Sequence, residues 1–153
     1  IPLGRTENGL PGTSRAGRIS ARAEVGAVVA NANANLPTTQ LFLTGGDNTV
    51  RGYAYESIGV ISSTGQTNGG RYLAVGSLEW QRPIYINGRR SDWESAVFVD
   101  AGSVSDTPAG LRADIGAGAG VIWNSPVGPL KADLAWGFAT SKLRLVLSVG
   151  FKF

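Results

Sequence analysis

The chain alternates between apolar and polar residues along several segments, and the last segment is the most regular. Every second position is apolar there, while polar residues or glycine fill most positions between: Leu143, Leu145, Leu147, Val149, Phe151 and Phe153. Successive side chains of a β-strand point to opposite faces of the sheet. This period of two therefore predicts a C-terminal strand with one apolar face.

The same period recurs upstream of this segment. We predict a strand over residues 18–31 and five more within residues 71–153, at about 71–83, 93–104, 113–124, 130–138 and 143–153. No segment has helical periodicity, so an all-β antiparallel fold is expected. Residues 1–17 are rich in Gly and Pro and are predicted to form a turn that leads out of a preceding strand. Residues 32–70 remain as one long loop.

Composition favours a membrane barrel over a soluble sheet. Charged residues make up 16% of the chain, whereas a soluble domain carries about 25%. Charges nevertheless fall in the middle of predicted strands on the polar face, as a wet lumen permits: Arg22, Glu24, Glu79, Asp100 and Asp133. Aromatic residues lie towards strand ends on the apolar face, as in an interfacial girdle: Trp123, Trp136, Phe138, Phe151 and Phe153. A soluble all-β domain, such as a ligand-binding barrel, is the alternative.

Several function classes are disfavoured by residues that the chain lacks. It has no Cys and no His, which removes disulfides, thiolate metal sites and Ser-His catalysis. We therefore expect no enzyme activity, no cofactor and no metal site. The net charge of +3 is scattered, whereas nucleic-acid binding needs a clustered basic face. The sequence also has no Met, so we expect it to be part of a longer chain.

Four short motifs follow one another along the chain. They are Val50-Arg51-Gly52-Tyr53 in the long loop, an F-x-D-x-G pattern at Phe98–Gly102, Ser125-Pro126-Val127-Gly128-Pro129, and the terminal Phe153. Their order resembles the signatures of the outer-membrane assembly and translocation barrels, the superfamily of BamA, TamA and the two-partner secretion transporters. This resemblance implies that the loop folds back into the barrel lumen and that its arginine meets an acidic residue on the wall.

The F-x-D-x-G strand offers the wall residue. A spacing of two places Phe98, Asp100 and Gly102 on a single face, which we assign to the lumen. Because a guanidinium can pair with a carboxylate through two parallel hydrogen bonds, Asp100 is the predicted partner of Arg51. Glu79, also assigned inward, is a second candidate. Alternate glycines between residues 116 and 120 leave room for the folded-in loop.

The loop also carries Gly45-Gly46-Asp47, and this version of the motif resembles TamA most and BamA nearly as well. The resemblance implies the C-terminal part of a 16-stranded barrel in the bacterial outer membrane, behind periplasmic POTRA modules and working with an inner-membrane-anchored partner. The implied role is the insertion of outer-membrane proteins or autotransporters, or envelope lipid transport. A two-partner secretion transporter and a passive outer-membrane pore are the alternatives.

In this superfamily the first and last strands meet at a weak seam that opens for client strands. The strand over residues 143–153 would form one side of that seam and would carry the C-terminal recognition signal. About six strands are fewer than the eight of the smallest single-chain bacterial barrels. We therefore expect the barrel to need missing upstream strands to close.

Overall fold

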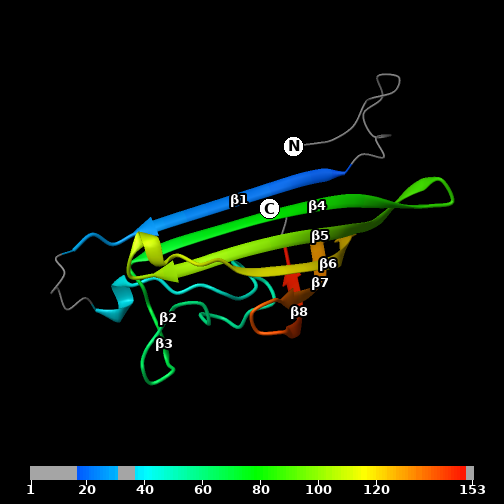
Figure 1. Cartoon of the computed structure of the whole chain (residues 1–153). Helices are drawn as coiled ribbons and strands as arrows, with labels where there is room; N and C mark the ends of the chain where they lie inside the picture. The colour runs from blue at the N-terminus through cyan, green and yellow to red at the C-terminus, as the bar shows by residue number, and fades with distance from the viewer. Residues whose placement is uncertain (1–16, 31–36, 151–153) are drawn as a thin grey trace.

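The computed structural model describes residues 17–30 and 37–150. Six strands form one antiparallel sheet, in which each strand pairs with the next one along the chain (Figure 1). They are β1 (Arg18–Ala27), β4 (Tyr72–Ile86), β5 (Arg89–Ser105), β6 (Asp114–Ser125), β7 (Gly128–Gly137) and β8 (Lys142–Val149). The all-β antiparallel fold expected from the alternation is thus confirmed. Residues 1–16 and the terminal Phe151 and Phe153 lie outside the described part.

The strand bounds differ from the predicted ones at three places. The first strand ends at Ala27 rather than at residue 31. β4 and β5 are longer than predicted, because they continue into a hairpin closed by Asn87 and Gly88. Both turn residues have positive φ, 51° and 75°, which suits the tight Asn-Gly turn of a hairpin. The alternation fails there because a register shift between Pro83 and Tyr85 interrupts the pairing.

The sheet is exposed on its apolar face. Leu145 and Leu147 of β8 are 63% and 69% exposed, whereas Asp100 of β5 and Asp133 of β7 are 1% and 2% exposed. A soluble protein buries its apolar residues and leaves its charges in water, whereas a membrane barrel turns its apolar side to lipid and keeps its charges inside. The structure therefore places the apolar side chains on the outer face of the sheet and the charged side chains on the inner face, as the alternation predicts.

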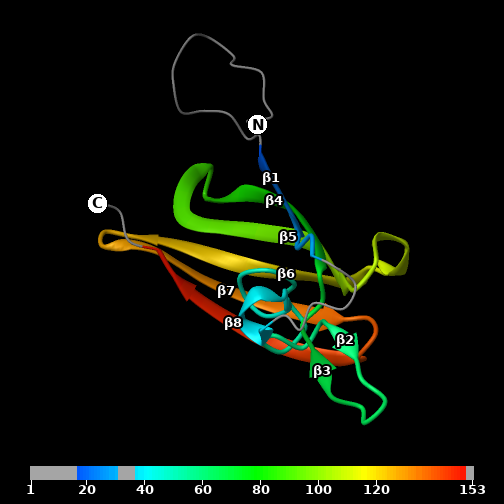
Figure 2. The same cartoon turned by 90° about the vertical axis from the view of Figure 1, so that its left-hand side faces the viewer.

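The long connection between β1 and β4 has a fold of its own. It contains a 3-10 turn, η1 (Thr38–Gln40), and two short paired strands, β2 (Val60–Ile61) and β3 (Thr67–Asn68). Isolated bridges join Phe42 to Gly70 and Thr44 to Ile58. The connection lies on the concave side of the curved sheet (Figure 2). This position brings the loop motif to the inner wall.

The connections at the two ends of the sheet differ in length. The β1–β4 connection, the β5–β6 connection with its 3-10 turn η2 (Pro108–Gly110), and residues 138–141 lie at one end. The β4–β5 and β6–β7 links at the opposite end are two-residue turns. Among residues 17–30 and 37–150, no helix is long and apolar enough to cross a membrane.

Candidate functional site

The tip of the β1–β4 loop is a compact turn. The backbone N–H of Gly46 donates to the Val50 carbonyl at 3.2 Å, and that of Thr49 donates to the Gly46 carbonyl at 3.1 Å. Gly45 and Gly46 both have φ of +104°, a region that residues with a Cβ rarely adopt. Val50 is fully buried and Arg51 is 8% exposed. The two glycines thus shape the turn that presents Arg51 to the wall.

Arg51 binds Asp100 through a fork of two hydrogen bonds. Its Nε donates to Oδ2 at 2.7 Å and its Nη2 donates to Oδ1 at 2.9 Å. The backbone N–H of Arg51 adds a third bond to Oδ2 at 3.1 Å. Asp100 therefore holds both the side chain and the backbone of the loop tip. Charge-assisted bonds of this bidentate kind are stronger and more directional than neutral ones.

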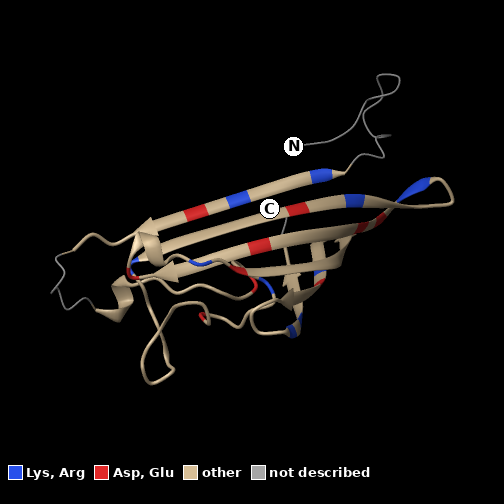
Figure 3. Ribbon diagram, viewed as in Figure 1, with Lys and Arg blue, Asp and Glu red and all other residues tan. Residues whose placement is uncertain are grey.

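The same guanidinium reaches two further strands. Its Nη1 donates to Glu79 Oε2 on β4 at 2.6 Å and to Asp133 Oδ2 on β7 at 3.0 Å. Lys131, also on β7, lies 2.5 Å from Glu79 Oε2 and 3.1 Å from Asp133 Oδ2. Two cations thus meet three carboxylates on the inner face, and we call these five residues the lumen cluster. Figure 3 shows the charged bands of β4 and β5 in mid-strand, above the loop.

Aromatic packing completes the seat of the guanidinium. Cζ of Arg51 lies 3.4 Å from the centre of the Phe98 ring, and Lys131 Nζ lies 5.9 Å from it. A cation over a ring face is attracted by the ring's negative face, more strongly where water is excluded. Phe98 is itself 5% exposed. The F-x-D-x-G strand therefore contacts Arg51 with both its aromatic ring and its carboxylate.

Wall glycines let the loop backbone approach closely. A Cβ at Gly102 would lie 2.5 Å from Val50 Cγ2, and a Cβ at Gly116 would overlap the Arg51 carbonyl oxygen. A Cβ at Gly137 would lie 2.6 Å from the Gly52 carbonyl oxygen. Gly52 has φ of +95° and lies against the same strand. The loop tip thus sits on a surface from which side chains are missing.

Tyr53 fastens the loop next to the β7–β8 turn. Its hydroxyl donates to the Ile115 carbonyl at 3.0 Å and accepts from the Ala139 N–H at 3.1 Å. The residue is 3% exposed. These two bonds join the loop to β6 and to the backbone that follows β7.

Burial disfavours the charge of Arg51, but its bonds to Asp100 and Glu79 outweigh burial and raise the pKa of Arg51 above its usual value. The guanidinium consequently stays charged at any pH at which the fold exists.

Within residues 17–30 and 37–150, no group of Asp or Glu is arranged to hold a metal ion.

The structure brings together most of the residues singled out in the sequence. Arg51 meets both Asp100 and Glu79, with Phe98 and Gly102 beside them. The sequence did not identify Asp133 and Lys131 as contacts of Arg51 or Glu79, although the alternation places Asp133 on the polar face. The predicted recognition strand is separate from the cluster: its Leu145, Leu147 and Val149 face outward and are exposed.

Known proteins resemble this chain in sequence and in fold. The Omp85 superfamily domain matches residues 4–153. Outer envelope protein 80 of the Arabidopsis thaliana chloroplast is 33% identical over 108 residues, which cover 63% of this chain and 13% of that protein. The crystal structure of BamA from Haemophilus ducreyi lacking POTRA domains 1–3 matches with a TM-score of 0.64 at 24% identity, over 88% of this chain and 32% of that one.

The chain therefore spans only a minor part of the length of both proteins. The match to BamA supports the curved antiparallel sheet as part of a barrel wall. Because the family domain covers nearly all of the sequence, the chain belongs to the Omp85 superfamily, whose members are β-barrel proteins of outer membranes.

Proposed function

We propose that this chain forms part of the barrel of an assembly or translocation factor that inserts other outer-membrane proteins. The observation that carries the proposal is the lumen cluster. One loop arginine contacts carboxylates on β4, β5 and β7, which lie within four neighbouring strands of the described sheet. A passive pore needs no such loop inside its lumen. A brace of this kind suits a barrel that must keep its shape while one part of it opens.

The side-chain contacts of Arg51 end one strand before the edge of the described sheet. The hydrogen bonds and ion pairs of Arg51 reach β4, β5 and β7, while β8 is joined to β7 through backbone pairing. An edge strand offers free N–H and C=O groups that can template pairing with another strand. We propose that β8 forms one side of the seam at which a client strand adds, while β4 to β7 stay fixed. The action requires no covalent chemistry.

The proposal extends to the type of factor and to the size of its complete barrel. The full-length protein would close as a 16-stranded barrel behind periplasmic POTRA modules, as the resemblance of its motifs implies. The name of the matched BamA structure mentions POTRA domains of that protein. The Gly45-Gly46-Asp47 sequence of the loop favours a TamA-type factor, which would work with an inner-membrane-anchored partner. Support of envelope lipid transport is the second role of this type.

The test is a reconstituted insertion assay with the full-length protein in lipid vesicles. We expect Arg51→Ala to slow the appearance of a folded client barrel at least several-fold, because its loss leaves buried carboxylates unpaired. The control is Arg112→Ala, which removes an arginine from the β5–β6 connection. The protein with this substitution should insert clients at the wild-type rate. Normal insertion by Arg51→Ala would contradict the proposal. Ion conductance without any client insertion by the wild-type protein would favour the passive pore.

A further inference from the structure

The β4–β5 hairpin reaches beyond both of its neighbouring strands. Pairing between β1 and β4 ends at Arg18 and Gln81, and pairing between β5 and β6 ends at Trp93 and Trp123. From Arg82 onward β4 is therefore paired only with β5 in the described sheet, and before Trp93 β5 is paired only with β4. Figure 1 shows this ribbon projecting past the rest of the sheet. It lies at the end with the short turns, which in outer-membrane barrels faces the periplasm.

Tryptophans mark the membrane boundary just before this ribbon. Trp80, Trp93 and Trp123 face outward and are 42%, 43% and 39% exposed. The rings of Trp93 and Trp123 are stacked with centres 6.1 Å apart. Amphipathic rings concentrate at the level of the lipid headgroups. The residue positions directly beyond these rings therefore lie among the headgroups.

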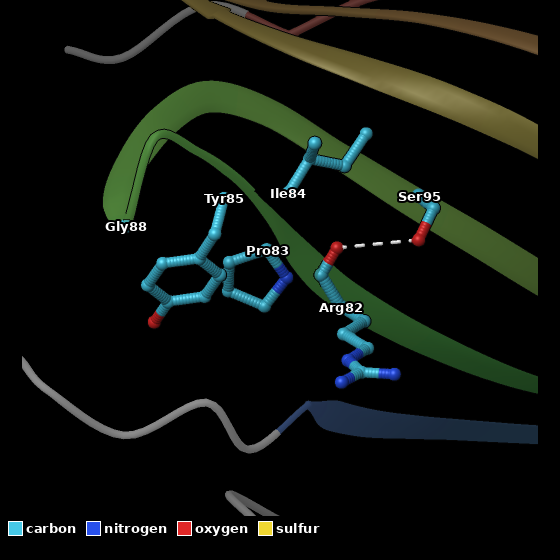
Figure 4. Close-up of a pocket in the computed structure, with 6 residues that line it drawn as sticks. All are labelled: Arg82, Pro83, Ile84, Tyr85, Gly88 and Ser95. Carbon is cyan, nitrogen blue, oxygen red and sulfur yellow. Dashed lines mark hydrogen bonds between the residues drawn. The ribbon is translucent and has the colours of Figure 1, made fainter.

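A hollow lies in this ribbon, directly beyond the three tryptophans. It is lined by Arg82, Pro83, Ile84, Tyr85, Gly88 and Ser95. Arg82 follows Trp80 by two residues, so both side chains leave β4 on the same face, and Arg82 pairs in register with Ser95. Figure 4 shows the Arg82 side chain next to the Pro83 ring, with the Tyr85 ring on the other side of Pro83.

Arg82 differs from two neighbouring arginines, Arg90 and Arg18, which bond to other side chains. Arg90 donates to Glu94 at 2.9 Å, and Arg18 bonds to Gln81. The Arg82 guanidinium makes no such bond to any residue in the described ranges, 17–30 and 37–150, and its side chain is exposed. A charge at the boundary of the hydrocarbon needs a counter-charge or water. Among the described residues, the Arg82 guanidinium thus has no bonded partner, and the rings of Pro83 and Tyr85 line the same hollow.

We propose that this hollow binds the phosphate group of a glycerophospholipid from the periplasmic leaflet. A guanidinium matches the geometry of phosphate and can donate two bonds to it. The Ser95 hydroxyl donates to the Arg82 carbonyl at 3.4 Å, a bond that joins β5 to β4 beside the guanidinium. The rings of Pro83 and Tyr85 offer apolar surface to the glycerol and the first carbons of the acyl chains. The lipid would thereby fix the height of the hairpin in the membrane.

The test measures lipid retention by the full-length protein. The protein is delipidated in detergent and mixed with phosphatidylglycerol, and bound lipid is counted by native mass spectrometry. Loss of one basic contact near a membrane surface weakens lipid binding about five-fold, so Arg82→Gln should show that loss. Arg144→Gln, which removes a charge from the lumen side of β8, should retain lipid as the wild type does. Arg82→Lys should fall between the two.

Two further arms use the wild-type protein alone, so the proposal stays testable if Arg82→Gln fails to fold. Diacylglycerol has the same acyl chains without the phosphate and should be retained much less than phosphatidylglycerol. Excess inorganic phosphate should leave the bound lipid in place. Equal retention of the two lipids, equal retention by Arg82→Gln and wild type, or displacement by inorganic phosphate would each overturn the proposal. So would a hairpin that binds a periplasmic protein but no phospholipid.

Discussion

At the scale of single residues, the loop tip depends on glycines of the wall as much as on charge. Gly116 is the sharpest case, because an added Cβ would overlap the Arg51 carbonyl oxygen. That oxygen belongs to the backbone and cannot move without shifting the whole tip. Overpacking of this kind costs about 1–3 kcal/mol.

We therefore expect Gly116→Ala to lower the unfolding temperature of the full-length protein. The measurement compares the gel mobility of folded samples with that of samples heated to increasing temperatures. Gly76→Ala is the matched control, since nothing lies within 4 Å of a Cβ at that position. An equal effect of the two substitutions would show that the loop tip does not rest on β6.

Tyr53 offers a second test at this scale. Tyr53→Phe removes the hydroxyl that bonds the Ile115 carbonyl and the Ala139 N–H. A hydrogen bond contributes about 0.5–1.5 kcal/mol to stability, so losing these two should lower the unfolding temperature. Tyr55→Phe, at a residue that is 80% exposed, should leave it unchanged. If both variants have the unfolding temperature of the wild type, the Tyr53 hydroxyl does not stabilise the position of the loop.

At the scale of elements, β8 has one face for lipid and one for the lumen. Leu147 is 69% exposed on the apolar face, and Ser148 lies on the opposite face in register with Lys131. An arginine in the middle of the lipid face costs about 2–4 kcal/mol. We expect Leu147→Arg to reduce the amount of folded barrel in the outer membrane far more than Ser148→Arg does. Equal yields would mean that the faces are exchanged, as a register slip of one residue would do.

The elements also show which parts of the fold alternation can predict. A period of two identified six strands and the side to which Asp100, Asp133 and Leu145 point, because a strand's facing is a local property. It missed the extension of β4 and β5, since the register shift near Pro83 breaks the period. The internal fold of the β1–β4 loop was missed as well, because isolated bridges and two-residue strands leave no periodic pattern.

At the scale of the whole molecule, curvature decides which inward residues meet. The motifs identified Arg51 and Asp100 as partners, and the structure places them in a bidentate pair. Asp133 and Lys131 lie on β7, two strands away from β5 in the sheet. The bending of the wall brings Lys131 within 2.5 Å of Glu79 on β4, and Asp133 within 3.0 Å of the loop residue Arg51. Sequence alternation gives no measure of that bending.

The loop and the wall are thus joined at one point where several strands converge. Breaking a buried ion pair by removing one partner costs about 3–5 kcal/mol, because the remaining charge is left uncompensated. Removal of Arg51 should therefore destabilise the wall through three strands at once. Removal of Asp100 takes away the fork and the backbone bond together.

The most direct test of this account is a double-mutant cycle on Arg51 and Asp100 in the full-length protein, with the free energy of unfolding measured by urea in lipid vesicles. We expect Arg51→Ala and Asp100→Ala each to lower that free energy. The double variant should lose less than the sum of the two, with a coupling energy of about 0.5–3 kcal/mol. Strictly additive losses would contradict the claim that the lumen cluster ties the loop to the wall.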